Sequence, residues 1–154
     1  MKILVLSDSH GATSPITNAI EKTNPDAVIF LGDGVREVDR LSDLYDIPFY
    51  LVKGNCDFGD YEDMQLIELR GKRLFFCHGH KYGVKGGYGA IAQAARKYGA
   101  DIALFGHTHS AYEHYEDGLY LLNPGSCAAP RGGRPSCGIV EIAGGSIITN
   151  IAEL

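Results

Sequence analysis

Residues 3–10 of the chain read ILVLSDSH, a short apolar run that ends in an acid and a histidine. Four consecutive apolar residues bounded by polar ones are typical of a strand that is buried on both faces of a sheet. The sheet fixes the backbone, so the loop at the end of the strand projects Asp8 and His10 from a defined place. The stretch therefore predicts a buried strand that delivers two candidate metal ligands.

The same arrangement recurs four more times along the chain. The further motifs, each preceded by an apolar, β-prone run, are Gly32-Asp33, Gly54-Asn55-Cys56-Asp57, His78-Gly79-His80 and Gly106-His107-Thr108-His109. Each motif is weak by itself, because a Gly-Asp turn or a pair of histidines fits many ordinary loops. Five such strand ends aimed at one point would supply the oxygen and nitrogen donors that two divalent cations need. Two metals about 3.5–4 Å apart are suited to hydrolysing phosphate esters at neutral pH.

The segments between the motifs indicate a mixed α/β sandwich built from layers. The β-α-β-α-β order of the first third predicts parallel strands with right-handed crossovers. Glycine-containing turns at Gly71-Lys72, Glu116-Asp117-Gly118 and Gly144-Gly145 predict three antiparallel hairpins. The expected strands are 3–6, 27–31, 48–52, 65–69, 73–77, 102–105, 111–115, 119–122, 138–143 and 146–151; the expected helices begin at Ser14-Pro15 and cover 35–44 and 90–98, with a loop at 81–89. We expect one domain over residues 1–154.

The composition excludes several classes of function. Fourteen Lys and Arg against nineteen Asp and Glu give a net charge of −5, which argues against binding to duplex nucleic acid. A bound divalent cation would invert the charge locally, so an anionic substrate is still permitted. No two of the four cysteines form a Cys-x-x-Cys pair, and no apolar stretch reaches membrane-spanning length. A cytoplasmic protein with reduced thiols and no membrane partner is the simplest prediction.

Taken in order, the motifs D-x-H, G-D, G-N-x-D, H-G and G-H-x-H resemble the calcineurin-like metallophosphoesterase superfamily. The GNCD and HGH forms and the short length resemble its small bacterial and archaeal phosphodiesterase branch. Asn123-Pro124-Gly125-Ser126 and Pro130-Arg131-Gly132 match that branch too, so the resemblance covers essentially the whole chain. It implies a four-layer α/β/β/α sandwich with two mixed β-sheets and a site at the strand ends.

The resemblance also implies a role for each matching position. The first metal would be bound by Asp8, His10 and His109, the second by Asn55, His78 and His107, and Asp33 would bridge both. Mixed carboxylate and imidazole ligands suit first-row metals, with Mn²⁺ expected first and Ni²⁺, Fe²⁺ or Zn²⁺ as alternatives. A metal-bridging hydroxide would attack phosphorus in line, and Arg131 would help to stabilise the developing charge. Asp33, Asn55, Asp57 and Arg131 are thus the candidate catalytic residues.

One position departs from the family pattern. Many relatives have a histidine directly after the asparagine, near the leaving group, where this chain has Cys56. A thiol is a poor substitute for an imidazolium as a proton donor or a positive clamp. We therefore expect a preference for phosphodiesters with good leaving groups. Cys56, His80 and Arg131 are the candidate substrate-binding residues, although His80 could equally pack on its loop, and Asp57 is expected to orient a ligand or a water molecule.

Three functions are compatible with these residues. A metal-dependent phosphodiesterase acting on small phosphodiesters is expected first, and a phosphomonoesterase or protein phosphatase is the alternative within enzymes. The third is a protein-binding scaffold like the retromer subunit with this fold, which has lost several ligand histidines. All seven ligand positions are present here, which does not indicate a decayed site. Cyclic nucleotides remain open as substrates although no residue is recognised as reading a base, and the edge strands or terminal hairpin could support a homodimer.

Overall fold

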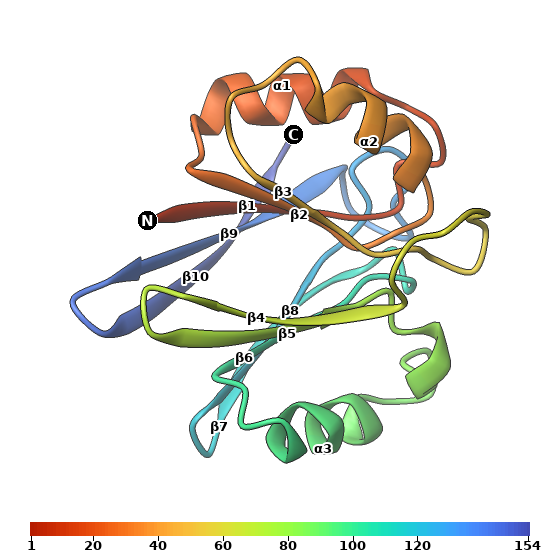
Figure 1. The fold of residues 1–154 in the computed structure, drawn as a ribbon. Helices are drawn as coiled ribbons and strands as arrows, with labels where there is room; N and C mark the ends of the chain where they lie inside the picture. Colours follow the sequence, from red (N-terminus) through yellow and green to blue (C-terminus); the bar gives the residue numbers. More distant parts are fainter.

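Two five-stranded sheets pack face to face between layers of helices (Figure 1). The structure is a computed structural model that describes residues 1–154. Helices α1 (Ser14–Thr23) and α2 (Val35–Ser42) cover the outer face of the first sheet, and α3 (Gly89–Lys97) covers the outer face of the second. The predicted α/β/β/α sandwich with two mixed sheets is therefore confirmed. No helix is long and apolar enough to cross a membrane.

The first sheet joins the start of the chain to its end. Its strand order is β10-β9-β1-β2-β3. The strands are β1 (Lys2–Leu6), β2 (Ala27–Phe30), β3 (Phe49–Leu51), β9 (Ser136–Ala143) and β10 (Ser146–Glu153). The first three are parallel, as the β-α-β-α-β pattern predicted, and β9 and β10 form the predicted terminal hairpin, which pairs antiparallel with β1.

The second sheet is built from the middle of the chain in the order β4-β5-β6-β8-β7. The strands are β4 (Met64–Leu69), β5 (Lys72–Cys77), β6 (Ile102–Leu104), β7 (Ala111–Glu116) and β8 (Leu119–Pro124). Strands β5, β6 and β8 are parallel, and the two predicted hairpins add β4 and β7 as antiparallel edges. Parallel strands of both sheets thus end at the side of the molecule where the motifs lie.

Strand β1 shows why a strand buried on both faces carries a continuous apolar run. Ile3 and Val5 point into the core between the sheets, where they meet residues such as Phe76 and Leu104 of the second sheet. Leu4 and Leu6 point the other way, into the core beneath α1 and α2. Successive side chains of a strand face opposite sides, so a strand covered on both sides needs a continuous apolar run. This double burial fixes the strand ends that hold the motifs.

Two local expectations differ from the structure. Helix α2 ends at Ser42 and not at Leu44, because the Leu44 side chain is 77% exposed and gains no core contact that would extend the helix. The expected loop at 81–89 begins with a short 3₁₀ turn, His80–Tyr82. That turn lies between two glycines with left-handed backbone, Gly79 at φ 106° and Gly83 at φ 60°, which confine it to one turn.

Candidate metal centre

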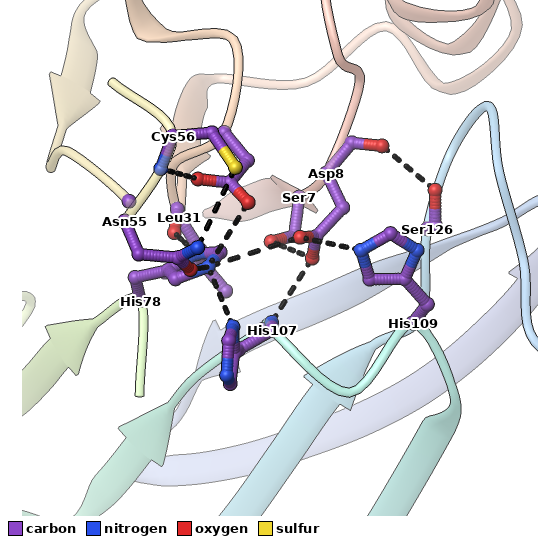
Figure 2. A network of polar contacts seen from close by, with 12 residues as sticks. Ser7, Asp8, Leu31, Asn55, Cys56, His78, His107, His109 and Ser126 are labelled. Atoms are coloured by element: carbon purple, nitrogen blue, oxygen red, sulfur yellow. Dashed lines mark hydrogen bonds and ion pairs between the residues drawn. The ribbon is translucent and has the colours of Figure 1, made fainter. Parts of the chain in front are cut away.

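All seven predicted ligands converge at one place. They lie in the loops that follow β1, β2 and β3 of the first sheet and β5 and β6 of the second. Figure 2 shows side chains from both sheets turned toward a common centre, with Asp8 and His109 on one side and Asn55, His78 and His107 on the other. The site therefore lies where the two sheets meet, at the carboxyl ends of their parallel strands.

The first group surrounds Asp8. His109 Nε2 lies 3.1 Å from Asp8 Oδ1, and His10 Nε2 lies 3.3 Å from His109 Nε2. His10 Nε2 is also 4.0 Å from Asp8 Oδ1 and 3.9 Å from Asp33 Oδ2. These are the three side chains that the resemblance assigns to the first metal, and they all offer an atom to the same small volume.

The second group surrounds His78. Its Nε2 lies 3.1 Å from Asn55 Oδ1, 3.2 Å from His107 Nδ1 and 3.4 Å from Asp33 Oδ2. The Asp33 carboxylate oxygen Oδ2 is thus within 4 Å of a histidine from each group. This is the position that a carboxylate shared between two ions requires.

The ring nitrogens show which atoms two of the histidines turn toward the site. His78 Nδ1 lies 2.7 Å from the carbonyl oxygen of Leu31, and His109 Nδ1 lies 2.7 Å from that of Ala129. A carbonyl only accepts, so each Nδ1 carries a proton and Nε2 is the nitrogen that each ring turns toward the site. Asp8 Oδ1, which faces both Nε2 atoms, is buried without a hydrogen-bond partner. A buried carboxylate oxygen without a hydrogen-bond partner fits a bound cation, and the nitrogen and oxygen atoms around it fit first-row divalent metals.

The electrostatics of the site also favour a positive charge at its centre. Burial alone would raise the pKa of Asp33, but the hydrogen bond and charge of His78 and the Cys56 amide lower it below its usual range. Burial alone would lower the pKa of His78, but Asp33 and Asp8 raise it. Burial and the charge of His78 lower the pKa of His107 to about 4, which keeps that imidazole neutral, as a metal ligand must be.

Backbone strain is concentrated at the ligands. Eight residues other than glycine have positive φ, and five of them are predicted ligands. Those five are Asp8, His10, Asp33, His107 and His109, with φ between 46° and 70°. The left-handed region costs free energy for side chains with a Cβ and persists where the surrounding structure enforces it, often at functional sites. The fold therefore holds these side chains in place at a cost to stability.

Two motif glycines are required by close approach of the loops. A Cβ at Gly32, which has φ 99°, would collide with the backbone of Gly54, and a Cβ at Gly106 would collide with Ser7 Oγ. The glycines of the G-D, G-N and G-H motifs thus let the ligand loops touch one another. Glycine is needed here for space as well as for its backbone conformation.

A layer of polar residues behind the ligands was not predicted. Ser7 Oγ donates to Asp8 Oδ2 at 2.6 Å, and Ser126 Oγ donates to the Asp8 carbonyl oxygen at 2.7 Å. Asn123 Nδ2 donates to the carbonyl oxygen of Gly106 at 2.9 Å and to Thr108 Oγ1 at 3.0 Å. The Asn-Pro-Gly-Ser stretch was quoted only for its resemblance. Its position directly after the apolar run of residues 119–122, at the end of β8, is the signal that could have assigned it to the site.

Asp57 binds backbone amides and no ligand. Its Oδ2 accepts from the N–H of Asp33 at 2.6 Å and of Gly54 at 2.8 Å, and its Oδ1 accepts from Gly34 at 2.8 Å and Val35 at 3.1 Å. One carboxylate therefore ties the loop after β2 and the start of α2 to the loop after β3. Asp57 was expected to orient a ligand or a water molecule. In this structure it positions candidate ligands indirectly, by binding the backbone of the loops that carry Asp33 and Asn55.

The three predicted substrate-binding residues lie in different surroundings. Cys56 is exposed, and its thiol groups with His10 and Asp33 beside a cavity of about 380 Å³. Arg131 is exposed, and its amide donates to the His109 carbonyl oxygen at 2.9 Å. His80 packs against the His78 ring, with centroids 5.4 Å apart, and lines a separate cavity of about 60 Å³. The structure thus places Cys56 and Arg131 beside the ligands at the surface and does not bring His80 to the larger cavity.

Sequence comparisons agree with this geometry. A model of the calcineurin-like phosphoesterase superfamily domain matches residues 1–145. A probable metallophosphoesterase of Mycoplasma pneumoniae is 36% identical over 138 residues, which cover 86% of this chain and 83% of that protein. The phosphodiesterase YfcE of Escherichia coli is 28% identical over 163 residues, which cover 88% of this chain and 84% of YfcE.

Solved structures share the fold over nearly the whole chain. A predicted phosphoesterase of Streptococcus pneumoniae superimposes with a TM-score of 0.86 at 28% identity, covering 99% of this chain and 88% of that one. Vps29 of Entamoeba histolytica in complex with Zn²⁺ superimposes with a TM-score of 0.80 at 23% identity, covering 99% of this chain and 98% of that one. From the ordered motifs, the convergent ligands and the match over residues 1–145, the chain belongs to the calcineurin-like phosphoesterase superfamily.

Proposed function

We propose that this protein is a metal-dependent phosphodiesterase that hydrolyses small phosphodiesters at a centre of two divalent metals. The observation that carries the proposal is the convergence of seven candidate nitrogen and oxygen ligands in two adjacent groups, with the buried Asp8 Oδ1 left without a hydrogen-bond partner. Asp33 lies between the two groups of ligands, where one carboxylate can serve both ions. The family supports phosphoester hydrolysis, and the name of YfcE supports diesters.

The roles of the chain's own residues follow from their positions. Bound divalent metals would polarise a phosphoryl oxygen and lower the pKa of a water molecule toward neutrality. His10, Asp33 and Cys56 line the cavity, so a phosphate that enters it reaches the ligands directly. Arg131, held beside His109 by its backbone, would donate to a phosphoryl oxygen from the surface. Nitrogen and oxygen donors without a predicted thiolate ligand support Mn²⁺ first, with Ni²⁺, Fe²⁺ or Zn²⁺ as alternatives.

Stripping the protein of metal tests this function. Hydrolysis of bis(p-nitrophenyl) phosphate is expected to fall to background without metal and to return with Mn²⁺, because the ligands alone cannot neutralise the phosphoryl oxygens. The measurement compares this diester with p-nitrophenyl phosphate after reloading with Mn²⁺, Ni²⁺, Zn²⁺ and Mg²⁺ separately, with bound metal counted by elemental analysis. A higher kcat/KM for the monoester would favour a phosphomonoesterase. No hydrolysis with two metals bound would favour a scaffold.

The cysteine at position 56 leads to a second test. Partial desolvation and the nearby Asp33 raise the pKa of the Cys56 thiol above its usual value, so it stays a neutral thiol at neutral pH and offers a leaving group no positive charge. Across a series of aryl methyl phosphates, log kcat/KM is expected to fall steeply as the leaving-group pKa rises. Cys56→His is expected to flatten that slope, because an imidazolium can protonate a basic leaving group. Cys56→Ser serves as the control, and a flat slope in the wild type would contradict the prediction.

Protein binding is the competing function. The Vps29 structures share the fold at low identity and are compatible with a scaffold of this shape. The complete ligand set and the strained backbone at five ligands favour the enzyme, because a surface used only for contact would not need either. The homodimer and the cytoplasmic location expected from the sequence stay predictions, to be tested by light scattering and by cell fractionation.

A further inference from the structure

A cavity of about 380 Å³ opens directly from the metal centre toward the first sheet's helices. Ligand residues His10 and Asp33 line its inner end together with Cys56, and Arg36, Glu37 and Phe58 line its outer end. Arg36 and Glu37 come from the first turn of α2, and Phe58 comes from the loop after β3, which projects beside α2 in Figure 1. A diester whose phosphorus lies at the metals would place one of its two substituents in this cavity.

Phe58 is the most exposed large apolar residue of the protein. Its side chain is 88% exposed, more than Leu44 at 77% or Ile148 at 61%, and no other aromatic ring contacts it. Leaving a phenyl ring in water at the mouth of a polar site forgoes the free energy of its burial. A flat ring stacked on Phe58 would recover that burial. Nucleobases stack on aromatic side chains through their faces, which leaves their edges free to form hydrogen bonds.

The polar side chains of the outer end complement the edge of such a ring. Arg36 is exposed and forms no ion pair, so its guanidinium donors are free. Glu37 beside it offers an acceptor. A nucleobase presents both acceptors and amino donors on its edge, whereas a plain aryl group would leave Glu37 without a partner. A second phosphate in the cavity is disfavoured, because Glu37 and Asp57 would repel it.

Hydrogen bonds fix the loop and the helix that line the cavity before any ligand binds. Asp57, which precedes Phe58, accepts from the amides of Gly34 and Val35 at the start of α2. Tyr61 Oη donates to Asp39 Oδ2 at 2.9 Å and ties the same loop to the next turn of the helix. A preorganised cavity loses little conformational entropy when a ligand enters, which favours binding.

We infer that this cavity is a nucleobase subsite, so that the substrates of the proposed phosphodiesterase are esters of nucleosides. The inference rests on the proposed function for its substrate and deepens it. The base stacks on Phe58, Arg36 donates to its edge and Glu37 accepts from it, while the phosphate lies at the ligands. None of these three residues belongs to a motif, so only the fold brings them to the site.

Binding measurements test the subsite independently of turnover. Calorimetry on Mn²⁺-loaded protein compares adenosine 5′-monophosphate with ribose 5-phosphate, which lacks only the base. The wild type is expected to bind the nucleotide about tenfold more tightly, since one stacked base contributes on that order. Phe58→Ala and Arg36→Gln are expected to remove most of the difference, and Phe58→Trp is expected to keep it. Arg40→Gln, an exposed arginine one helical turn after Arg36 and outside the cavity, is the matched control.

The outcomes separate the two proposals. Equal binding of the two phosphates by the wild type, or an equal loss of both in Phe58→Ala, would overturn the subsite. So would a complete absence of binding by either compound in protein with bound Mn²⁺. A base preference that depends on Phe58, found in protein that fails to cleave bis(p-nitrophenyl) phosphate, would support the subsite while refuting the phosphodiesterase.

Discussion

Asp33→Asn is expected to lower kcat/KM for diester hydrolysis by at least about 10³-fold while the fold survives. The substitution keeps the size of the side chain, and its amide oxygen can still accept the Cys56 N–H that Asp33 Oδ1 accepts at 2.9 Å. It removes the negative charge that lies between His10 and His78, where a single carboxylate serves both groups of ligands. The two metals would then lose their common ligand.

Thermal unfolding with and without Mn²⁺ distinguishes loss of metal from loss of fold. A ligand at 100 times its Kd stabilises a protein by about 2.7 kcal/mol, so the wild type is expected to melt at a higher temperature with Mn²⁺. Asp33→Asn is expected to melt near the wild type without metal and to lose most of the increase. Asp46→Asn, an exposed acid between α2 and β3 that belongs to no motif, should behave as the wild type. An Asp33→Asn protein with full activity would remove the carboxylate from the mechanism.

Asp57→Ala is expected to lower the free energy of unfolding by about 3–5 kcal/mol, although Asp57 contacts no ligand side chain. Its carboxylate accepts four backbone N–H groups at 2.6–3.1 Å, and alanine would leave all four without that partner. For a chain of this length the melting temperature should fall by about 10 °C. Activity should fall too, because the same bonds position the loops that carry Asp33 and Asn55.

Two further variants locate the cause of this effect. Asp57→Asn would turn an amide NH₂ toward two backbone donors, so it is expected to destabilise the protein despite its matching shape. Asp60→Ala removes an exposed acid of the same loop that makes no hydrogen bond and should leave stability unchanged. If Asp57→Ala had the same melting temperature as the wild type, water would be replacing the carboxylate and the proposed role of Asp57 would be wrong.

Much of the fold could be predicted from the sequence, because burial of a strand or a helix face produces a simple pattern of apolar residues. Strands β1 and β2 are covered on both faces, so every buried position is apolar, and their runs were recognised within one residue. The hairpin of β7 and β8 was recognised from Glu116-Asp117-Gly118, where Asp117 and Gly118 both adopt positive φ. The end of α2 was misplaced by two residues because nothing local tells whether Leu44 will reach the core.

The convergence of the candidate ligands was predictable for a related reason. Each ligand follows an apolar strand or a glycine that the strand end requires, so a local pattern marks each of Asp8, Asp33 and His78. Their common target was implied by the family resemblance and by the edge at which parallel strands end. Asn55, His107 and His109 came with the same motifs, and the structure brings them to that point.

Tertiary structure alone decided how the site is held and what lies beside it. Ser126 reaches Asp8 across 118 positions of sequence, and Asp57 braces a helix that begins 22 positions before it. Arg36 and Phe58 share a cavity only because α2 packs next to the loop after β3. The sequence determined the strands and marked the candidate ligands, because burial and close approach restrict residue type locally. A hydrogen bond or a cavity between two distant loops depends on how the loops are placed relative to each other. It restricts the pair of loops and neither loop alone, so no single stretch of sequence indicates it.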